Sequence, residues 1–169
     1  MGRNILCVLA GFDDKTEAVL SGMQDKLYGQ GFSGVQTKGI PMHFTLGTYG
    51  TEREEELKER LEQIASTTKA FDVDFNHVGL FNLVQNHVLF IKPEISREML
   101  DLKDRFRDSD DKFKWSSHST LLIDKPEVIR EALPLIINDF TAFEGKVSVI
   151  HLYEFWPARH ILTVKLGDK

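Results

Sequence analysis

The sequence predicts an α+β protein with two pseudo-symmetric lobes of mainly antiparallel sheet, outer helices and a central cleft. Apolar residues recur with strand and helix periods in alternating segments, and several predicted strands have connections short enough for antiparallel pairing. The order of elements also divides into two similar halves, which begin near Asn4 and near Asn86. We therefore expect one bilobal domain over residues 1–169, with an internal duplication whose halves cover about 4–83 and 86–167.

The first half contains segments that each have a local signal. In order, we expect a strand over 4–12, a helix from Asp14, a loop over 29–39, a strand over 42–46, a helix from Thr51 and a strand over 71–76. Asp14 with Glu17 is an N-cap pattern, and Thr51 with Glu54 is a capping box. Apolar and polar residues alternate over 71–76, which is the period of a half-buried strand.

The second half repeats this order of elements and adds a final hairpin. We expect a strand over 86–91, a helix from Ser96 to about Arg107, a mobile loop over 108–117, a strand over 118–123, a helix over about 126–140 and strands over 146–155 and 160–166. Pro93 ends the first of these strands. Pro134 is expected to kink or split the last helix, since an interior proline costs about 3 kcal/mol.

Composition restricts the classes of function. The net charge of −5 argues against a protein that wraps long nucleic acid, but one nucleotide or an oligonucleotide end needs only one or two cations. The single cysteine, Cys7, excludes a disulfide framework and a cysteine zinc cluster. No segment approaches the roughly 20 apolar residues of a membrane span. We therefore expect a cytoplasmic protein without a membrane segment, acting as a monomer.

Two short motifs occupy equivalent places in the two halves. They are His43-Phe44-Thr45-Leu46 and His118-Ser119-Thr120-Leu121, and no other histidine has threonine two residues later. On a strand, residues i and i+2 point to the same face, so each histidine shares a face with its threonine. A pseudo-two-fold axis between the halves would bring two imidazoles and two hydroxyls to one cleft.

This set of groups suits the cleavage of a phosphate ester. Attack on phosphorus needs a base for the nucleophile and an acid for the leaving oxygen. Histidine, with a reference pKa near 6.5, performs either role at neutral pH. Threonine hydroxyls donate to the non-bridging oxygens, where negative charge accumulates. We therefore predict His43 and His118 as the catalytic residues and Thr45 and Thr120 as phosphate-binding residues, with no cofactor and no metal.

The two motifs, with Pro41 before the first, resemble the paired signature of the two-histidine phosphoesterase superfamily. This superfamily includes the bacterial 2′-5′ RNA ligase and cyclic phosphodiesterase proteins. The segments 78–81 and 149–155 are also similar to stretches that follow its motifs. The resemblance implies a bilobal fold and metal-independent hydrolysis of a cyclic or 2′-linked nucleotide phosphodiester, such as a 2′,3′-cyclic phosphate, in RNA processing. One departure is that Ser116 stands where the first motif has Pro41.

Several other residues are weaker candidates for the site. Tyr49, Trp115 and Trp156 are candidates to stack on a base, although core or loop packing explains them equally well. Arg159 is a candidate for a phosphate contact, with an exposed turn residue as the favoured interpretation. His77 and His151 follow the apolar side of their strands, so we expect them in the core or at a subunit contact.

Two other classes of function stay open at this point. One is a nucleotide-binding module on the same fold that hydrolyses nothing. The other is a metal-dependent hydrolase, since imidazole is a common metal ligand, but a third ligand with a comparable signal is missing. Histidine and threonine are intact in both motifs, which favours the enzyme over the binding module. Turnover in excess chelator separates the two hydrolases.

Overall fold

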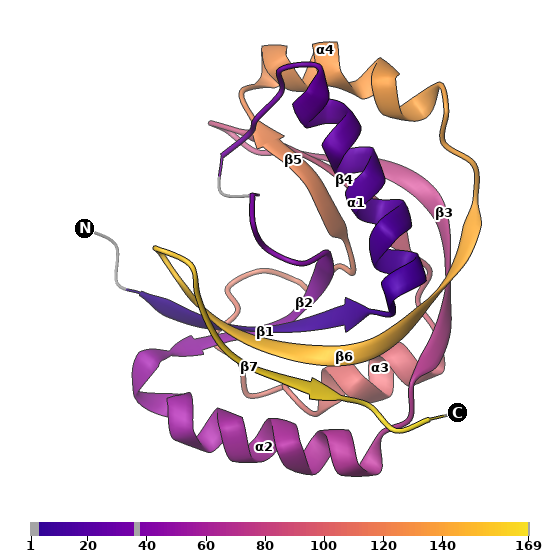
Figure 1. Cartoon of the computed structure of the whole chain (residues 1–169). Coiled ribbons are helices and arrows are strands. Elements are labelled where there is room, and N and C mark those ends of the chain that lie inside the picture. The colour runs from indigo at the N-terminus through magenta and orange to yellow at the C-terminus, as the bar shows by residue number, and fades with distance from the viewer. Residues whose placement is uncertain (1–3, 36–37, 169) are drawn as a thin grey trace.

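The computed structural model describes residues 4–35 and 38–168 and has the α+β architecture predicted from the sequence. In chain order its elements are β1 (Ile5–Phe12), α1 (Asp14–Gly29), β2 (His43–Gly50), a 3₁₀ turn (Thr51–Arg53), α2 (Glu54–Thr67), β3 (Phe71–Asn82), β4 (His87–Pro93), α3 (Arg97–Asp104), β5 (Ser119–Asp124), α4 (Pro126–Ile137), β6 (Phe143–Phe155) and β7 (Arg159–Lys165). Figure 1 shows their arrangement.

All seven strands belong to one antiparallel sheet. Their order is β2-β1-β6-β3-β4-β5, with β7 also paired to β6. The long strands β3 and β6 pair with each other only over 71–75 and 143–147, and then diverge to different partners. We call β2, β1, β7 and the later part of β6 the first lobe. The second lobe is β5, β4 and the later part of β3.

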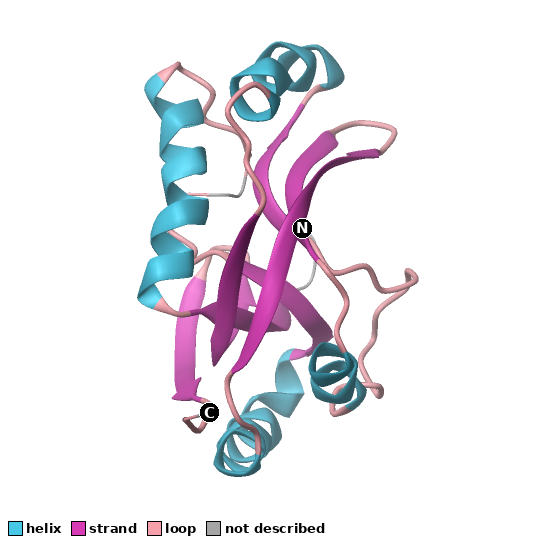
Figure 2. Ribbon diagram, turned by 90° about the vertical axis from the view of Figure 1, so that its right-hand side faces the viewer, coloured by secondary structure: helices cyan, strands magenta, loops and turns pink. Residues whose placement is uncertain are grey.

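The helices lie around the outside of the strands (Figure 2). α1 packs against strands of both lobes, α4 covers β4 and β5, and α2 lies against β6 and β7. One apolar core runs through both lobes, and the stacked rings of Phe75 and Phe143, 4.7 Å apart, mark the place where β3 meets β6. Across the described ranges, no helix combines the length and apolar character of a membrane span.

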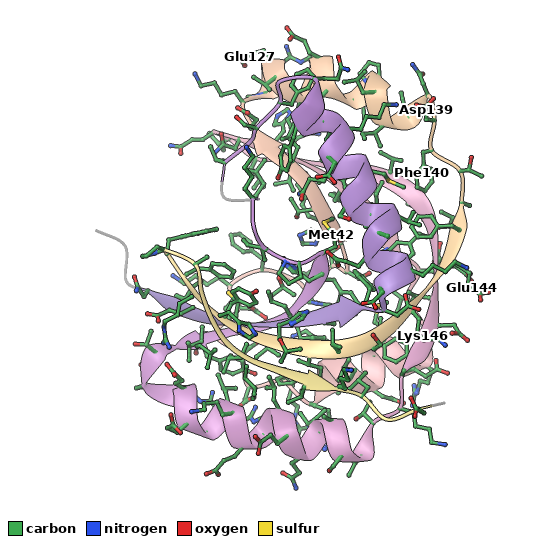
Figure 3. All side chains as sticks on the ribbon, in the orientation of Figure 1. Met42, Glu127, Asp139, Phe140, Glu144 and Lys146 are labelled. Carbon is green, nitrogen blue, oxygen red and sulfur yellow. The ribbon has the colours of Figure 1, made fainter. Side chains whose placement is uncertain are left out.

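The first turn of α1 is capped, and a second carboxylate of this turn positions the first motif. The carboxylate of Asp13, one residue before the predicted cap, accepts a hydrogen bond from the backbone N–H of Thr16 at 2.9 Å. One turn into the helix, both carboxylate oxygens of Glu17 lie 3.0 Å from the backbone nitrogen of Met42. Met42 lies between α1 and the strands of the first lobe (Figure 3). This contact fixes the residue directly before His43.

The ends of the other helices correct three predictions and confirm one. Thr51 forms no capping box, because residues 51–53 form a 3₁₀ turn and α2 begins only at Glu54. α3 stops at Asp104, while Ser96 caps it as predicted, accepting from the N–H of Met99 at 3.1 Å. α4 is not split by Pro134, which lies in its last turn, and it ends at Ile137. Figure 3 labels Glu127 and Asp139 near its two ends.

Candidate active site

The first motif has the orientation predicted from its alternating pattern. On β2 the side chains of Met42, Phe44 and Leu46 are buried in the core, while His43 and Thr45 are half-buried on the opposite face. Gly11 of the neighbouring strand β1 lies directly opposite His43 in the ladder. The residue next to His43 across the ladder therefore has no side chain, and His43 is on the face opposite the core.

The second motif has the same arrangement, with His118 directly before β5 and Thr120 on the strand. Ser119 and Leu121 are buried, and His118 and Thr120 are half-buried. β2 and β5 are the two ends of the strand order, yet they contact each other because the long strands β3 and β6 turn the sheet back on itself. The sheet therefore brings together two motifs that are far apart along the chain.

The motif side chains line two cavities. The larger, of about 550 Å³, is lined by Thr45 and His118 together with the loop that carries Trp115. The smaller, of about 140 Å³, is lined by His43 and Thr120 together with Trp156. Each cavity thus takes the histidine of one motif and the threonine of the other.

The two imidazoles are oriented by equivalent hydrogen bonds. Nδ1 of His43 lies 2.7 Å from the carbonyl oxygen of Pro41, and Nδ1 of His118 lies 2.7 Å from that of Ser116. A carbonyl oxygen only accepts, so Nδ1 carries the hydrogen in both rings. In a neutral ring the free lone pair is then on Nε2. Ser116 therefore supplies the same contact as Pro41, although the two residues differ.

Burial controls the protonation of both rings. It lowers the pKa of His43, and the neighbouring His118 lowers it further, while the hydrogen bond to Pro41 acts in the opposite direction. Burial likewise lowers the pKa of His118, against the hydrogen bond to Ser116. Because each pKa lies below the usual value, the neutral ring is favoured at pH 7. The effect of His118 on the pKa of His43 indicates that the two rings lie within electrostatic reach of each other.

The two histidines differ in their ring neighbours. His118 meets Phe81 edge-on, with ring centroids 4.7 Å apart, and lies 5.5 Å from Phe90. The ring of Phe90 fits here only because residue 79 is a glycine. A Cβ atom on Gly79 would lie 2.4 Å from the Phe90 ring. On the other side of the cleft, the ring nearest Gly11 is that of His151. His118 therefore lies among apolar rings, and His43 lies beside another imidazole.

Trp115 and Trp156 lie at the cavities, as the sequence suggested. Trp115 is half-buried and lines the larger cavity with Lys112, Phe113 and Lys114. Trp156 is 40% exposed and lines the smaller one. Each tryptophan is thus placed where a base could lie against it.

Tyr49 and Arg159 are placed differently from the sequence hypothesis. Tyr49 is only 1% exposed, and the guanidinium of Arg53 covers its ring at 4.7 Å, so neither face is free for a base. Arg159 forms ion pairs with Glu54 and Glu154 at 2.6 Å and lines neither cavity. These contacts correct the predicted base contact of Tyr49 and phosphate contact of Arg159.

Two further histidines were also misplaced. His77 is an exposed residue that forms an ion pair with Glu94 at 3.2 Å, so it is not in the core. His151 is half-buried on the cleft face beside His43. Its place on this face was not predictable from the sequence, because it depends on how β6 pairs with β1. Within residues 4–35 and 38–168, no cluster of three or more acidic, cysteine or histidine side chains is arranged to hold a metal ion.

A bilobal α+β fold in which two His-x-Thr motifs face one cleft is the fold of the two-histidine phosphoesterases. The family model described as the 2′-5′ RNA ligase superfamily matches residues 24–155. The chain belongs to this superfamily, which confirms the resemblance seen in the sequence. Membership supports an enzyme that processes phosphodiesters as the general class of activity. No protein with a curated description matches the chain.

Solved structures of the same fold cover nearly the whole chain. The apo form of LigT from E. coli has a TM-score of 0.64 and 15% identity, with 99% of each chain covered. TT0787 of Thermus thermophilus has a TM-score of 0.63 and 17% identity, with 98% of this chain and 99% of the other covered. Usb1 of Kluyveromyces marxianus has a TM-score of 0.51 and 14% identity, covering 96% and 97%. At these identities the likeness shows the fold.

Proposed function

We propose that this protein hydrolyses a cyclic or 2′-linked nucleotide phosphodiester, such as a 2′,3′-cyclic phosphate, without a metal. The observation that carries the proposal is the crossed arrangement of the motifs. His43 and Thr120 line one cavity, and His118 and Thr45 line the other. A phosphate bound between the two motifs would have one imidazole and one hydroxyl on each side.

The chemistry follows from the state of the two rings. The neutral histidine takes a proton from water through Nε2 while the water oxygen bonds to phosphorus. The other histidine, protonated, gives its proton to the ribose oxygen as the phosphorus–oxygen bond breaks. Thr45 and Thr120 donate to the non-bridging oxygens that gain negative charge. Repulsion between the rings favours a single shared charge, which is the state this scheme requires.

The larger cavity favours a nucleotide or an oligonucleotide end as the substrate. Its volume of about 550 Å³ lies within the usual range for small-molecule sites. Phe113 and Trp115 offer rings, and Lys112 and Lys114 offer local cations in a chain whose net charge is −5. LigT from E. coli has been crystallised with 3′-AMP, which fits the same class of ligand. We further propose that the protein acts as a cytoplasmic monomer.

The test is a substrate screen in excess chelator. Nucleoside 2′,3′-cyclic phosphates and 2′-5′ linked dinucleotides are incubated with the protein, and phosphorus NMR identifies the product phosphate. Turnover that persists in chelator and disappears in the His43→Ala/His118→Ala double variant is the expected result. Turnover that appears only with an added divalent metal would instead indicate a metal-dependent hydrolase. Tight nucleotide binding without any turnover would indicate a binding module.

A further inference from the structure

His151 lies on the same face of the sheet as the first motif. In the ladder, Leu9 of β1 is opposite Thr45 on one side and opposite His151 of β6 on the other. Directly opposed residues of antiparallel strands point to the same face. His151 is therefore in one row with Thr45, across three adjacent strands. The next row of the same face holds His43 and Gly11.

The ring of His151 leans out of its own row toward that of His43. A Cβ atom on Gly11 would lie 2.5 Å from Nε2 and 2.9 Å from Cδ2 of His151, so this ring occupies the space above the glycine. Gly11 is the ladder partner of His43. The absence of a side chain at this position thus lets Nε2 of His151 approach the motif histidine.

The opposite edge of the ring is fixed by two residues of β7. Nδ1 of His151 lies 2.7 Å from Oγ1 of Thr163, and the same oxygen lies 2.8 Å from Nε2 of His160. A hydroxyl donates one hydrogen bond and accepts two, so Thr163 joins both rings. Among the described residues, none forms a hydrogen bond with Nε2 of His151. Nε2 lies on the Gly11 side of the ring, and His151 is not among the residues that line the two cavities.

The second lobe has no equivalent group. In the second lobe, Phe90 of β4 is opposite Thr120 on one side and opposite Gly79 on the other. Leu9 of β1 has the same relation to Thr45 and His151 in the first lobe. Gly79 therefore occupies the place that His151 has in the first lobe. His151 therefore has no counterpart in the second lobe. This difference indicates that His151 has a specific role beside His43, in addition to the roles of the two His-x-Thr motifs.

We propose that His151 is a third histidine of the active site and donates a hydrogen bond from Nε2 to a phosphate oxygen of the substrate. The identity of the ligand as a phosphodiester rests on the proposed function. In this arrangement His160 donates to Thr163, the hydroxyl of Thr163 donates to Nδ1 of His151, and the ring hydrogen is on Nε2. The three groups form a chain that presents one donor to the cleft.

Burial supports this role. It lowers the pKa of His151 to about 4, and the neighbouring His43 and His160 lower it in the same direction. The neutral form of His151 is therefore favoured at pH 7. It contributes a donor without adding a third charge to the cleft. A neutral donor binds phosphate without competing for the proton that the reaction transfers.

Matched variants test the contact through activity. His151→Phe keeps a ring but removes the donor, and His151→Gln places an amide near the position of Nε2. We expect His151→Phe to lower kcat/KM by about 10- to 100-fold, the scale of one hydrogen bond to a charged group, mainly through KM. His151→Gln should recover most of this loss. Thr163→Val should cause part of it and Thr163→Ser little, while the surface variant His77→Ala serves as the unchanged control.

A binding measurement separates this inference from the proposed function. Inorganic phosphate and a nucleoside 2′-monophosphate are titrated into ¹⁵N-labelled protein, and the imidazole resonances are followed by NMR. We expect the Nε2 signal of His151 to shift, and the affinity for both ligands to fall in His151→Phe. A shift without turnover of any phosphodiester would overturn the proposed function alone. Wild-type affinity and wild-type kcat/KM in a folded His151→Phe variant would overturn the role of His151.

Discussion

The indole Nε1 of Trp115 donates a hydrogen bond to the carbonyl oxygen of Thr45, with 2.8 Å between the two atoms. The donor belongs to the loop that leads into the second motif, and the acceptor belongs to the first motif. The ring of Trp115 also meets Phe44 edge-on, with centroids 6.4 Å apart. This contact links the loop before the second motif directly to the backbone of the first, so the spacing of the catalytic groups depends on it.

Trp115→Phe should therefore affect stability and activity together. The variant keeps an aromatic ring but leaves the Thr45 carbonyl without its donor, which costs about 1–3 kcal/mol of unfolding free energy. We expect kcat/KM to fall by about tenfold, because a small misplacement of reacting groups costs this much or more. Urea unfolding and steady-state kinetics measure the two effects. Val84→Ala, at a fully exposed position that lines neither cavity, should change neither, and an unaffected Trp115→Phe would show that the bond has no role.

His43→Ala and His118→Ala should each lower kcat by about 10²–10⁴-fold, the scale for loss of one proton-transfer group. The double variant should lose little more than the worse single variant, because the pair acts as a unit. Both side chains face the cleft, so the melting temperature should change little. Each is measured on a 2′,3′-cyclic nucleotide beside a thermal melt. Wild-type kcat in either folded variant would remove that residue from the acid–base pair.

The pH profile should have its optimum on the acidic side of the usual histidine value. Burial lowers the pKa of both His43 and His118. The acid therefore loses its proton at a lower pH, and both limbs of the kcat/KM profile are displaced toward lower pH. A bound phosphate raises both pKa values, so the kcat profile should lie at higher pH. The limbs belong to the coupled pair.

Thr45→Val and Thr120→Val provide the control for this profile. Each variant should lower the height of both curves, by about 10²- to 10³-fold for one lost donor to a developing charge, and leave their limbs in place. The threonines stabilise charge but transfer no proton. Flat profiles between about pH 5 and 9 in chelator-treated active enzyme, or limbs displaced by either substitution, would contradict the assignment.

Gly79→Ala tests the packing behind His118. A Cβ at this position lies 2.4 Å from the ring of Phe90, so the ring must move, and overpacking of this kind costs about 1–3 kcal/mol. Since Phe90 also contacts His118, kcat should fall with stability. Gly22→Ala, within α1, is the matched control, because a Cβ atom on Gly22 would have no neighbouring atom within 4 Å. That change should stabilise the protein by about 0.5–1 kcal/mol; chemical unfolding compares the two variants.

The parts of the site that were predictable are those that local geometry determines. The apolar residues Met42, Phe44 and Leu46 define one face of a strand, which leaves His43 and Thr45 on the other. Two copies of this pattern in equivalent positions were sufficient to identify the motifs. The cap at Ser96 was predictable for the same reason, since a cap involves only neighbouring residues.

The residues that were misread depend on pairing between distant segments. His151 reaches the cleft because β6 pairs with β1, more than a hundred residues away, in one particular register. A shift of one residue would turn it to the other face. Tyr49 looked available for stacking, but Arg53 covers its ring and Asp108 of a distant loop contacts its hydroxyl. The contact with Asp108 has no signal in the local sequence.

β6 lies between β1 and β3 in the sheet, although it follows both of them by more than sixty residues. A backbone cut at the tip of the β3–β4 hairpin, where Val84 is fully exposed, would leave β1 and β3 on one fragment and β6 on the other. Each fragment would carry one catalytic motif and an incomplete sheet. Activity recovered by mixing the two fragments would then report their docking, because neither could assemble the cleft without strands from the other.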